Sequence, residues 1–473
     1  MNTTDYLEFL ERTALTGLEL SEQERTRFAH PPLISVICDG AMDLSAQSYR
    51  GFSLLRRAEA GSAQGDFLLF VPEGSVLSRD ALYRFAFEIA LGADFIYCDE
   101  DRVENGVRKE PRFKPDYSPE TLMFVNYIGD CFAVSKRLFQ SCGGVADEAH
   151  SLVLRLCGAA AKVAHIPRVL LTRGAVRESE RRSFIPPAAF KSVSVIVISD
   201  RGRDELSRTL RGLESGSVYS NYSFYIADAA PHDSRLEKLY SALEKNGAAR
   251  IIGGGESCNR AALLNRCAAD AEGEYLLFLN AASYPVREDF LEQLMGILAL
   301  DGVGAAGSML INRDGTLHSC GTVVGLFGGL FSLYSGFAPR KNDPLYRNFA
   351  GTIRNVTVLP IDGLMTSREL FLQLCGFDET LQVAGFSEDY CLRLMAMGKR
   401  AVYNPNAELC VLQPLPVAID AKNDMRLMDV FRPLLVSTDP FYNPNYDYNC
   451  GVPEVASAPV SPLILHSRNG KWV

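Results

Sequence analysis

Two stretches of the chain consist almost entirely of apolar residues, and each follows a pair of prolines. LISVIC (33–38) comes directly after Pro31-Pro32, and SVSVIVIS (192–199) follows a second pair at 186–187. Largely apolar runs of this length are typical of strands in a parallel sheet that is covered on both faces. Such runs alternate with helix-like segments in both halves. The pattern therefore predicts an α/β fold with doubly wound, mostly parallel sheets.

The second half of the pattern repeats the first. GDFLLFVPEGS (65–75) and GEYLLFLNAAS (273–283) are the same apolar strand followed by a polar turn, 208 positions apart. SKRLFQSCGG (135–144) parallels SRELFLQLCGF (367–377) in the same way. A solenoid repeats every 20–50 residues or so. The much longer spacing predicts two similar domains in tandem.

The expected organisation has five parts. They are a charged helical extension over 1–30 with its helix at 5–28, a first α/β domain over 31–172, a linker over 173–191, a second α/β domain over 192–412 and a C-terminal tail over 413–473. The linker carries Arg173, Arg177, Arg181 and Arg182. A basic run of this kind is a solvated segment or a patch that faces phosphate or lipid, and the sequence leaves both readings open.

Composition narrows the class of protein. The net charge of −9 argues against a nucleic-acid partner, which would require concentrated Lys and Arg. Twelve dispersed cysteines without a CxxC pair indicate reduced, buried thiols. We find no signal peptide and no apolar run of about 18 residues. The expected location is the cytoplasm, with peripheral attachment to the inner face of the membrane as the alternative.

Several longer segments resemble one family. In the first half these are ADFIYCDEDRVENG (93–106) and FKPDYSPETLMFVNYIGD (113–130); in the second they are GTLHSCGTVVGL (315–326) and LRLMAMGKRAVYNPNAEL (392–409), before a closing DPFYNPNYD (439–447). Together and in order, they resemble the tandem family 2 glycosyltransferases that build bacterial surface polysaccharides such as O-antigens.

The resemblance implies a fold and an activity. Each half would be a Rossmann-like domain of the GT-A type that binds a nucleotide-sugar. The reaction would be transfer of the sugar, with inversion at the anomeric carbon, to a growing and often lipid-linked glycan acceptor. The implied partners are the nucleotide-sugar donor, this acceptor and another glycosyltransferase.

By the same resemblance, the nucleotide would be contacted by Asp228, Asn265 and Asn280. The leaving diphosphate is normally neutralised by Mg²⁺ or Mn²⁺ on an Asp-x-Asp turn, because hard cations require carboxylate or other oxygen ligands. Here the matching turns read Pro72-Glu73-Gly74 and Asn280-Ala281-Ala282-Ser283. Alanine cannot ligate a metal, so we predict no metal site and assign no cofactor. The charge would then fall to arginines, for which Arg260, Arg266 and Arg287 are candidates.

The general base would come from Glu388-Asp389, within GFSEDYCLRL (385–394). A carboxylate in reach of the acceptor hydroxyl supplies general-base catalysis worth about 10²–10⁴-fold. The family motif aligns Ser387 with the base, and a small shift of the loop would present Asp389 instead. Both acids also suit a helix cap.

The first half lacks these groups. Ala149 and Ser151 stand where acids would be, and His150 between them is expected to be a lone surface histidine. What remains is the cluster Asp99-Glu100-Asp101, which is either a solvated turn or, by the resemblance, part of the acceptor side of the cleft.

Two functions follow from these observations. The first is a sugar transferase that uses its second domain without a tightly held metal. The second is a catalytically inactive relative that binds a glycan, a nucleotide or an active transferase. The preserved strands and turns serve packing, so they agree with both.

Overall fold

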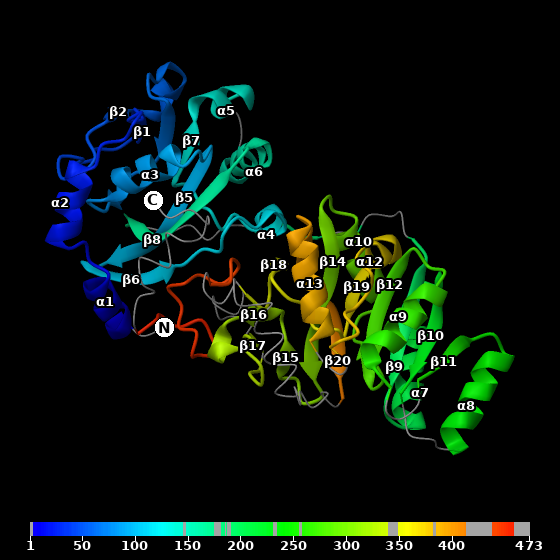
Figure 1. The fold of residues 1–473 in the computed structure, drawn as a ribbon. Helices are drawn as coiled ribbons and strands as arrows, with labels where there is room; N and C mark the ends of the chain where they lie inside the picture. Colours follow the sequence, from blue (N-terminus) through cyan, green and yellow to red (C-terminus); the bar gives the residue numbers. More distant parts are fainter. Residues whose placement is uncertain are drawn as a thin grey trace. The chain divides into compact units, whose positions relative to one another are not determined.

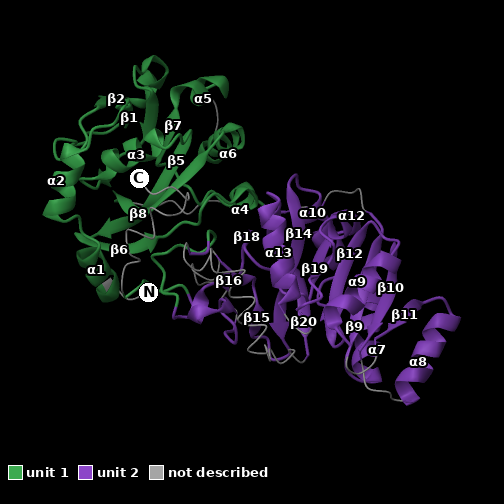
Figure 2. Cartoon of the chain, in the orientation of Figure 1, with its two compact units in different colours: residues 1–182, 440–448, 453–473 green, residues 183–439, 449–452 purple. Residues whose placement is uncertain are grey.

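The computed structural model describes residues 3–144, 148–174, 181–184, 186, 191–229, 234–254, 258–338, 349–381, 385–412 and 438–457. The chain divides into two compact units (Figure 2). Unit 1 comprises residues 1–182, 440–448 and 453–473, and unit 2 comprises residues 183–439 and 449–452. Val145-Ala146-Asp147, Arg177 and most of the expected tail lie outside the described residues.

Unit 1 contains a mixed sheet (Figure 1). Its described strands are β1 (Ile34–Ile37), β2 (Phe52–Leu55), β3 (Phe67–Phe70), β4 (Val76–Leu77), β5 (Phe95–Glu104), β6 (Val107–Arg112), β7 (Phe132–Ser135) and β8 (Val163–Arg173). They are ordered β2-β1-β3-β7-β5-β8-β4, and β6 pairs with β5. The described helices are α1 (Thr3–Arg12), α2 (Gly17–Arg25), η1 (Arg57–Ser62), α3 (Ala81–Ala90), α4 (Pro119–Phe124), α5 (Lys136–Ser141) and α6 (Ala149–Ala159).

Both faces of this sheet are buried, which explains the largely apolar run of β1. Along β1, Ile34 and Val36 pack into one core cluster, while Ile37 packs into a second one. Along β3, Leu69 belongs to the first cluster and Leu68 to the second. Successive side chains of a strand point to opposite faces. An apolar residue is therefore favoured at nearly every position; the exception in β1 is Ser35, whose hydroxyl is hydrogen-bonded with that of Ser53 on β2.

The N-terminal extension forms two helices rather than the expected single helix. The break comes at Thr16, whose side chain accepts a hydrogen bond from the Glu19 backbone while the Glu19 carboxylate accepts one from the Thr16 backbone. This capping box satisfies backbone donors at the start of α2.

Unit 2 contains a second mixed sheet. Its described strands are β9 (Val193–Ser199), β10 (Tyr222–Asp228), β11 (Ala249–Gly253), β12 (Tyr275–Asn280), β13 (Ser283–Pro285), β14 (Val303–Asn312), β15 (Leu317–Ser319), β18 (Arg354–Val356), β19 (Leu364–Ser367) and β20 (Arg400–Val411). The order is β11-β10-β9-β12-β19-β14-β20-β13, with β15 on β14 and β18 on β20. A separate hairpin pairs β16 (Thr322–Val324) with β17 (Leu330–Ser332).

The helices of unit 2 connect these strands. Those described are α7 (Arg203–Gly216), α8 (Ser234–Lys245), α9 (Arg260–Asp270), α10 (Phe290–Leu298), η2 (Leu326–Gly328), α12 (Arg368–Gln373) and α13 (Phe386–Ala396). α9 packs against β9, β10 and β11, α10 against β14 and β20, and α13 against β20.

The two sheets share one order of neighbours. In unit 1, β3 pairs in parallel with β1 and antiparallel with β7. In unit 2, β12 pairs in parallel with β9 and antiparallel with β19. The repeated segments of the sequence thus occupy the same position in each sheet. The predicted α/β class is confirmed. The antiparallel β7 and β19 each separate parallel strands in the middle of their sheet, and β4, β6, β13, β15 and β18 also pair antiparallel with their neighbours.

Candidate functional site

The strand order of unit 2 identifies one edge of its sheet as a candidate site. From β9, the chain first passes to β10 on one side, and β12 then lies on the other side. In open α/β sheets, ligands bind beyond the carboxyl ends of the strands at such a switch point. The last residues of β9, β10 and β12 are Ser199, Asp228 and Asn280. Asp228 and Asn280, both predicted to contact the nucleotide, therefore lie at this edge.

Asp228 is held by a tyrosine that sequence reasoning missed. The hydroxyl of Tyr240, on α8, donates to Oδ1 of Asp228 over 2.8 Å and lies 2.9 Å from the hydroxyl of Ser199. Burial, and then the neighbouring Asp228 carboxylate, raise the pKa of Tyr240. The tyrosine stays protonated and connects the ends of β9 and β10. Its position on a helix with a polar face gave no signal in the sequence.

The turn after β12 closes on a second residue that sequence reasoning missed. Asp362, just before β19, accepts a hydrogen bond from the backbone N–H of Asn280 over 3.0 Å and another from the hydroxyl of Ser283. Asp362 is buried, and burial raises its pKa to about 6. Ala281 and Ala282 in the middle of the turn are also buried, and Ala282 has a positive φ of 81°.

This donor set does not fit a tightly bound divalent cation. Both carboxylate oxygens of Asp362 already accept hydrogen bonds from the turn. The side-chain oxygen of Asn280 is buried without a hydrogen-bond partner, but it is a single neutral oxygen. Nowhere in the described ranges do three or more His, Cys, Asp or Glu residues gather as metal ligands would. The turn therefore does not supply the charged ligands that a divalent cation requires.

α13 precedes β20 and packs against it, and the last residue of β20, Val411, pairs with Ser283 of the Asn280 turn. The first turn of α13 carries Ser387, Glu388 and Asp389. The hydroxyl of Ser387 donates to Glu388 over 2.8 Å. Burial raises the pKa of Glu388.

Asp389 is engaged within the protein. Its carboxylate forms an ion pair of 2.7 Å with Arg393, one turn along α13. Arg393 also donates to the carbonyl oxygens of Leu374 and Gly376, over 2.6 and 2.8 Å. Asp389 thereby holds the arginine that fixes the Cys-Gly-Phe turn after α12.

Asn265 has a similar structural role. Its amide accepts from the Phe377 N–H over 2.8 Å and donates to the Phe377 carbonyl oxygen over 2.9 Å and to Glu379 over 3.1 Å. The amide joins α9 to the turn that follows α12. Its polar atoms are thus taken up by the protein rather than presented at the edge of the sheet.

The arginines proposed to neutralise diphosphate have protein partners as well. Arg260 pairs with Asp200 over 2.7 Å, and Arg287 pairs with Asp289 over 2.9 Å. Arg266 donates to the carbonyl oxygen of Gly253 over 2.8 Å.

In unit 1 the acid cluster lies in the interior. Asp99 accepts from the backbone N–H of Lys114, and its carboxylate lies 2.9 Å from His165 Nε2. Two amides from the far end of the chain, Asn443 and Asn445, donate to it as well. Burial lowers the pKa of His165, but the carboxylates of Asp99 and Asp116 outweigh it and raise the pKa overall.

The neighbouring acids are paired in the same way. Glu100 forms ion pairs with Lys114 and Arg173, over 3.2 and 3.3 Å. Asp101 accepts from the hydroxyl of Tyr6 on α1 over 2.6 Å. All three cluster residues are at most 1% exposed. Their burial corrects the expectation of a solvated turn and presents no carboxylate to an acceptor.

The remaining expectations for unit 1 also change. His150 is buried, with Nε2 2.5 Å from the Leu122 carbonyl oxygen, and burial lowers its pKa. It is therefore not the surface histidine that was expected. Arg173, assigned to a linker, ends β8 as part of the buried ion-pair network, whereas Glu73 is exposed.

Comparison with known proteins gives two relatives. The chain is 29% identical over 444 residues to the O-antigen biosynthesis protein RfbC of Myxococcus xanthus, covering 81% of this chain and 34% of that protein. It is 23% identical over 399 residues to the uncharacterized protein y4gI of Sinorhizobium fredii, covering 73% of this chain and 44% of that protein. The chain thus spans less than half the length of either relative. No model of a known protein family matches it.

Comparison with solved structures gives matches that include two with nucleotides bound. GalNAc-T7 with UDP, GalNAc and Mn²⁺ is 14% identical with a TM-score of 0.42, covering 55% of this chain and 51% of that one. The mannosyltransferase PcManGT from Pyrobaculum calidifontis, in complex with GDP-Man and Mn²⁺, is 19% identical with a TM-score of 0.36, covering 49% and 60%. None of the helices in the described ranges is both long enough and apolar enough to cross a membrane.

Proposed function

We propose that unit 2 transfers a sugar from a nucleotide-sugar donor to a cell-surface glycan acceptor, with inversion at the anomeric carbon. One observation carries the proposal: the ends of β9, β10 and β12 bring Ser199, Asp228 and the Asn280 turn together at the switch point of the sheet. The sequence resemblance to family 2 glycosyltransferases supports it, as does the similarity to a protein named for O-antigen biosynthesis.

Asp228 and Tyr240 would recognise the nucleotide. Asp228 is only half-buried, so its carboxylate can accept hydrogen bonds from a base or ribose while Tyr240 fixes its position. Because the carboxylate is already held in position, less conformational entropy is lost when the nucleotide binds. The Asn280 turn, braced by Asp362, would pass beneath the ribose and the diphosphate.

Glu388 would be the general base. Burial raises its pKa, which brings a carboxylate closer to the working pH that favours proton transfer. It would take the proton of the acceptor hydroxyl while the oxygen forms a bond to the anomeric carbon. The bond from that carbon to the diphosphate breaks, and the nucleoside diphosphate leaves with the electron pair. Asp389, tied to Arg393, would position this first turn of α13.

Unit 1 would support sugar transfer by unit 2 rather than catalyse a reaction of its own. Its acid cluster is consumed by internal hydrogen bonds, and the acids expected at the start of α6 are replaced by Ala149 and Ser151. We propose that it binds the acceptor glycan or a partner transferase. A lipid-linked acceptor would bring the chain to the inner face of a membrane as a peripheral protein.

The second candidate function is a non-catalytic scaffold. It is favoured by the Asn280 turn, which has no carboxylate of its own and closes on Asp362. Such a protein would bind a glycan or a transferase through the same fold without turning over a nucleotide-sugar.

Thermal unfolding with UDP, TDP and GDP, each with Mn²⁺ and then with EDTA, separates these functions. A ligand that binds only the folded state stabilises it by about 2.7 kcal/mol at a hundredfold excess over its Kd. We expect a rise in Tm with one nucleotide that persists in EDTA. A rise that requires Mn²⁺ would contradict our interpretation of the turn. No rise with any nucleotide would refute the transferase and leave the scaffold.

A further inference from the structure

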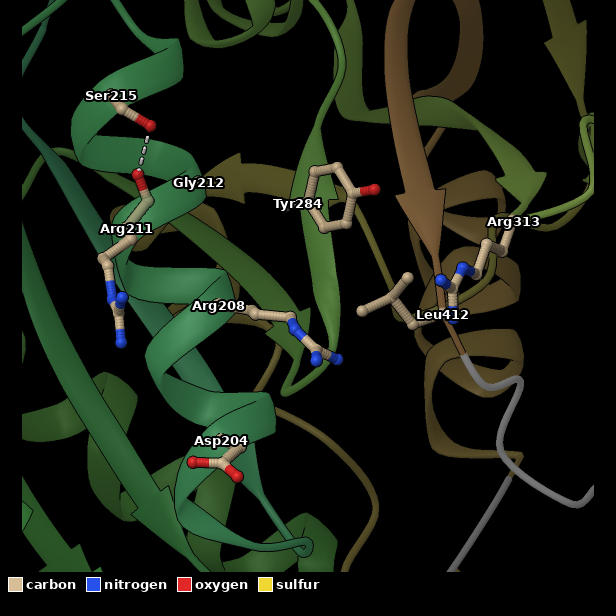
Figure 3. A pocket seen from close by; sticks show the side chains of 8 residues that line it. All are labelled: Asp204, Arg208, Arg211, Gly212, Ser215, Tyr284, Arg313 and Leu412. Carbon is tan, nitrogen blue, oxygen red and sulfur yellow. Dashed lines mark hydrogen bonds between the residues drawn. The ribbon is translucent and has the colours of Figure 1, made fainter.

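A cavity of about 540 Å³ opens beside α7 in unit 2 (Figure 3). Its lining residues come from α7, β13 and the ends of β14 and β20. They are Asp204, Arg208, Arg211, Gly212, Ser215, Tyr284, Arg313 and Leu412. Three arginines and one aspartate give this lining a net positive charge, whereas the whole chain carries −9. A basic concavity on an acidic protein attracts anions.

The arginines of this cavity have no counter-ion in the part of the chain that the structure describes. Arg208, Arg211 and Arg313 form no ion pair or side-chain hydrogen bond there, in contrast to Arg260 and Arg287. Arg208 and Arg313 approach the space beside Leu412 from two walls, and Arg211 points away from Tyr284 (Figure 3).

The pKa of Tyr284 gives separate evidence that Arg208 and Arg313 lie close to this side chain. Its hydrogen bond with Cys410, and then burial, raise its pKa, while the positive charges of Arg313 and Arg208 oppose the rise. Both guanidinium groups therefore lie close enough to act on the phenol. The tyrosine can approach α7 because residue 212 is a glycine: a Cβ there would lie 2.5 Å from Cβ of Tyr284.

The cavity is joined directly to the Asn280 turn. Tyr284 follows Ser283, the last residue of that turn. On one wall, the N–H of Leu412 donates to the carbonyl oxygen of Ala282 over 3.0 Å. On the other, Thr209 of α7 accepts from the N–H of Ala282 over 2.9 Å. The arginines of the cavity thus lie on the elements that hold the Asn280 turn. This turn is the part of the sequence that lacks metal-binding carboxylates.

We propose that this cavity binds a diphosphate group, with Arg208 and Arg313 as its clamp. Guanidinium groups donate to phosphate oxygens in a bidentate manner, and two of them on facing walls match the two phosphates. Their charge would stabilise the diphosphate without a cation. The inference deepens the proposed function and rests on it only for the source of the diphosphate, which is either the donor nucleotide or a lipid-linked acceptor.

Calorimetry on the full chain tests the clamp with inorganic pyrophosphate as the probe. We expect binding at low ionic strength that weakens steeply with salt, because the clamp is exposed to screening. Arg208→Ala and Arg313→Ala should each weaken it about tenfold, the loss expected for a hydrogen bond to a charged group. Arg203→Ala removes the same charge from an exposed position of α7 outside the cavity and should leave the affinity unchanged.

UDP, GDP and farnesyl diphosphate then identify the source. Loss of nucleoside diphosphate binding in the double variant Arg208→Ala/Arg313→Ala assigns the clamp to the donor. Loss confined to farnesyl diphosphate assigns it to a lipid-linked acceptor. All three arginines are exposed, so the variants should fold, and an unchanged Tm without ligand verifies this.

The proposal is overturned if the wild-type chain binds no pyrophosphate, or if the double variant binds it as well as Arg203→Ala does. These outcomes differ from failure of the transferase. A chain that loses pyrophosphate through Arg208 and Arg313 but turns over no nucleotide-sugar keeps the clamp and refutes the transferase. If the double variant keeps both the turnover and the pyrophosphate binding of the wild-type chain, the clamp is refuted and the transferase stands.

Discussion

The carboxylate of Asp362 accepts the hydroxyl hydrogen bond of Ser283, a residue 79 positions earlier in the chain. Together with the N–H of Asn280, this bond fastens the turn after β12 to the start of β19. A carboxylate thus stands beneath the turn, and the turn itself carries none. The carboxylate contributes to the shape of the site, and its burial has a cost that depends on pH.

Replacing Asp362 by Asn should remove this pH dependence. Burial raises the pKa of Asp362 to about 6, so between its ordinary pKa and 6 the folded state binds the proton more tightly than the unfolded state does. The wild-type chain therefore loses stability as pH rises through this window, by up to about 3 kcal/mol. Asn cannot titrate. Relative to wild type, Asp362→Asn should gain stability from pH 4 to 6.5, as measured by urea unfolding.

Asp447→Asn is the matched control, because it makes the same substitution at a carboxylate that is only half-buried. A constant difference in the free energy of unfolding between Asp362→Asn and wild type across this pH range would contradict the buried, titrating carboxylate.

Glu388→Gln should lower kcat by about 10²–10⁴-fold if Glu388 is the base. The amide keeps the hydrogen bond from Ser387 but cannot take a proton. Because burial raises the pKa of Glu388, wild-type activity should rise with pH above the usual carboxylate range of about 4.3. The rate of nucleotide release from a nucleotide-sugar, followed against pH, measures both effects.

Glu369→Gln is the control for charge alone, since Glu369 is exposed in the first turn of α12. Activity in Glu388→Gln equal to that in Glu369→Gln would exclude Glu388 as the base.

Tyr240→Phe should weaken nucleotide binding about two- to tenfold, as expected for the loss of one hydrogen bond. Without the hydroxyl, the Asp228 carboxylate is no longer fixed beside Ser199. Tyr222→Phe removes a hydroxyl from the other end of β10 and should have no effect. Titration calorimetry with the nucleotide that raises Tm makes the comparison, and equal affinities in the two variants would count against the role of Tyr240.

The His165→Gln variant should lose a pH dependence of stability that arises from neighbouring charges, whereas that of Asp362 arises from burial. The pKa of His165 is raised in the folded state by Asp99 and Asp116. Its contribution to stability is complete below the unfolded pKa of about 6.5 and is lost as pH rises through the folded value. The difference in the free energy of unfolding between wild type and His165→Gln should therefore shrink above pH 6.5. Parallel pH profiles would show that His165 does not titrate in this range.

The sequence predicted the α/β class and the paired strands well, because buried strands and their turns are recorded in consecutive residues such as GEYLLFLN (273–280). Sequence reasoning failed for residues whose hydrogen-bond partners lie far away along the chain. Asp99 looks the same whether it faces water or receives donors from Asn443 and Asn445, and Asp362 shows no sign of the turn it braces. The ion pair between Asp389 and Arg393 could have been predicted from the sequence, since charges of opposite sign at i and i+4 on a helix attract each other.

The hydrogen bonds from Asn443 and Asn445 to Asp99 span 344 and 346 positions. A ribosome completes the sheet of unit 1 long before it reaches these asparagines. Until then, the Asp99 carboxylate lacks two of its donors, and a buried anion without donors is costly. The unit whose sheet is synthesised first consequently remains incomplete until residues 440–448, which belong to the same unit, have also been made.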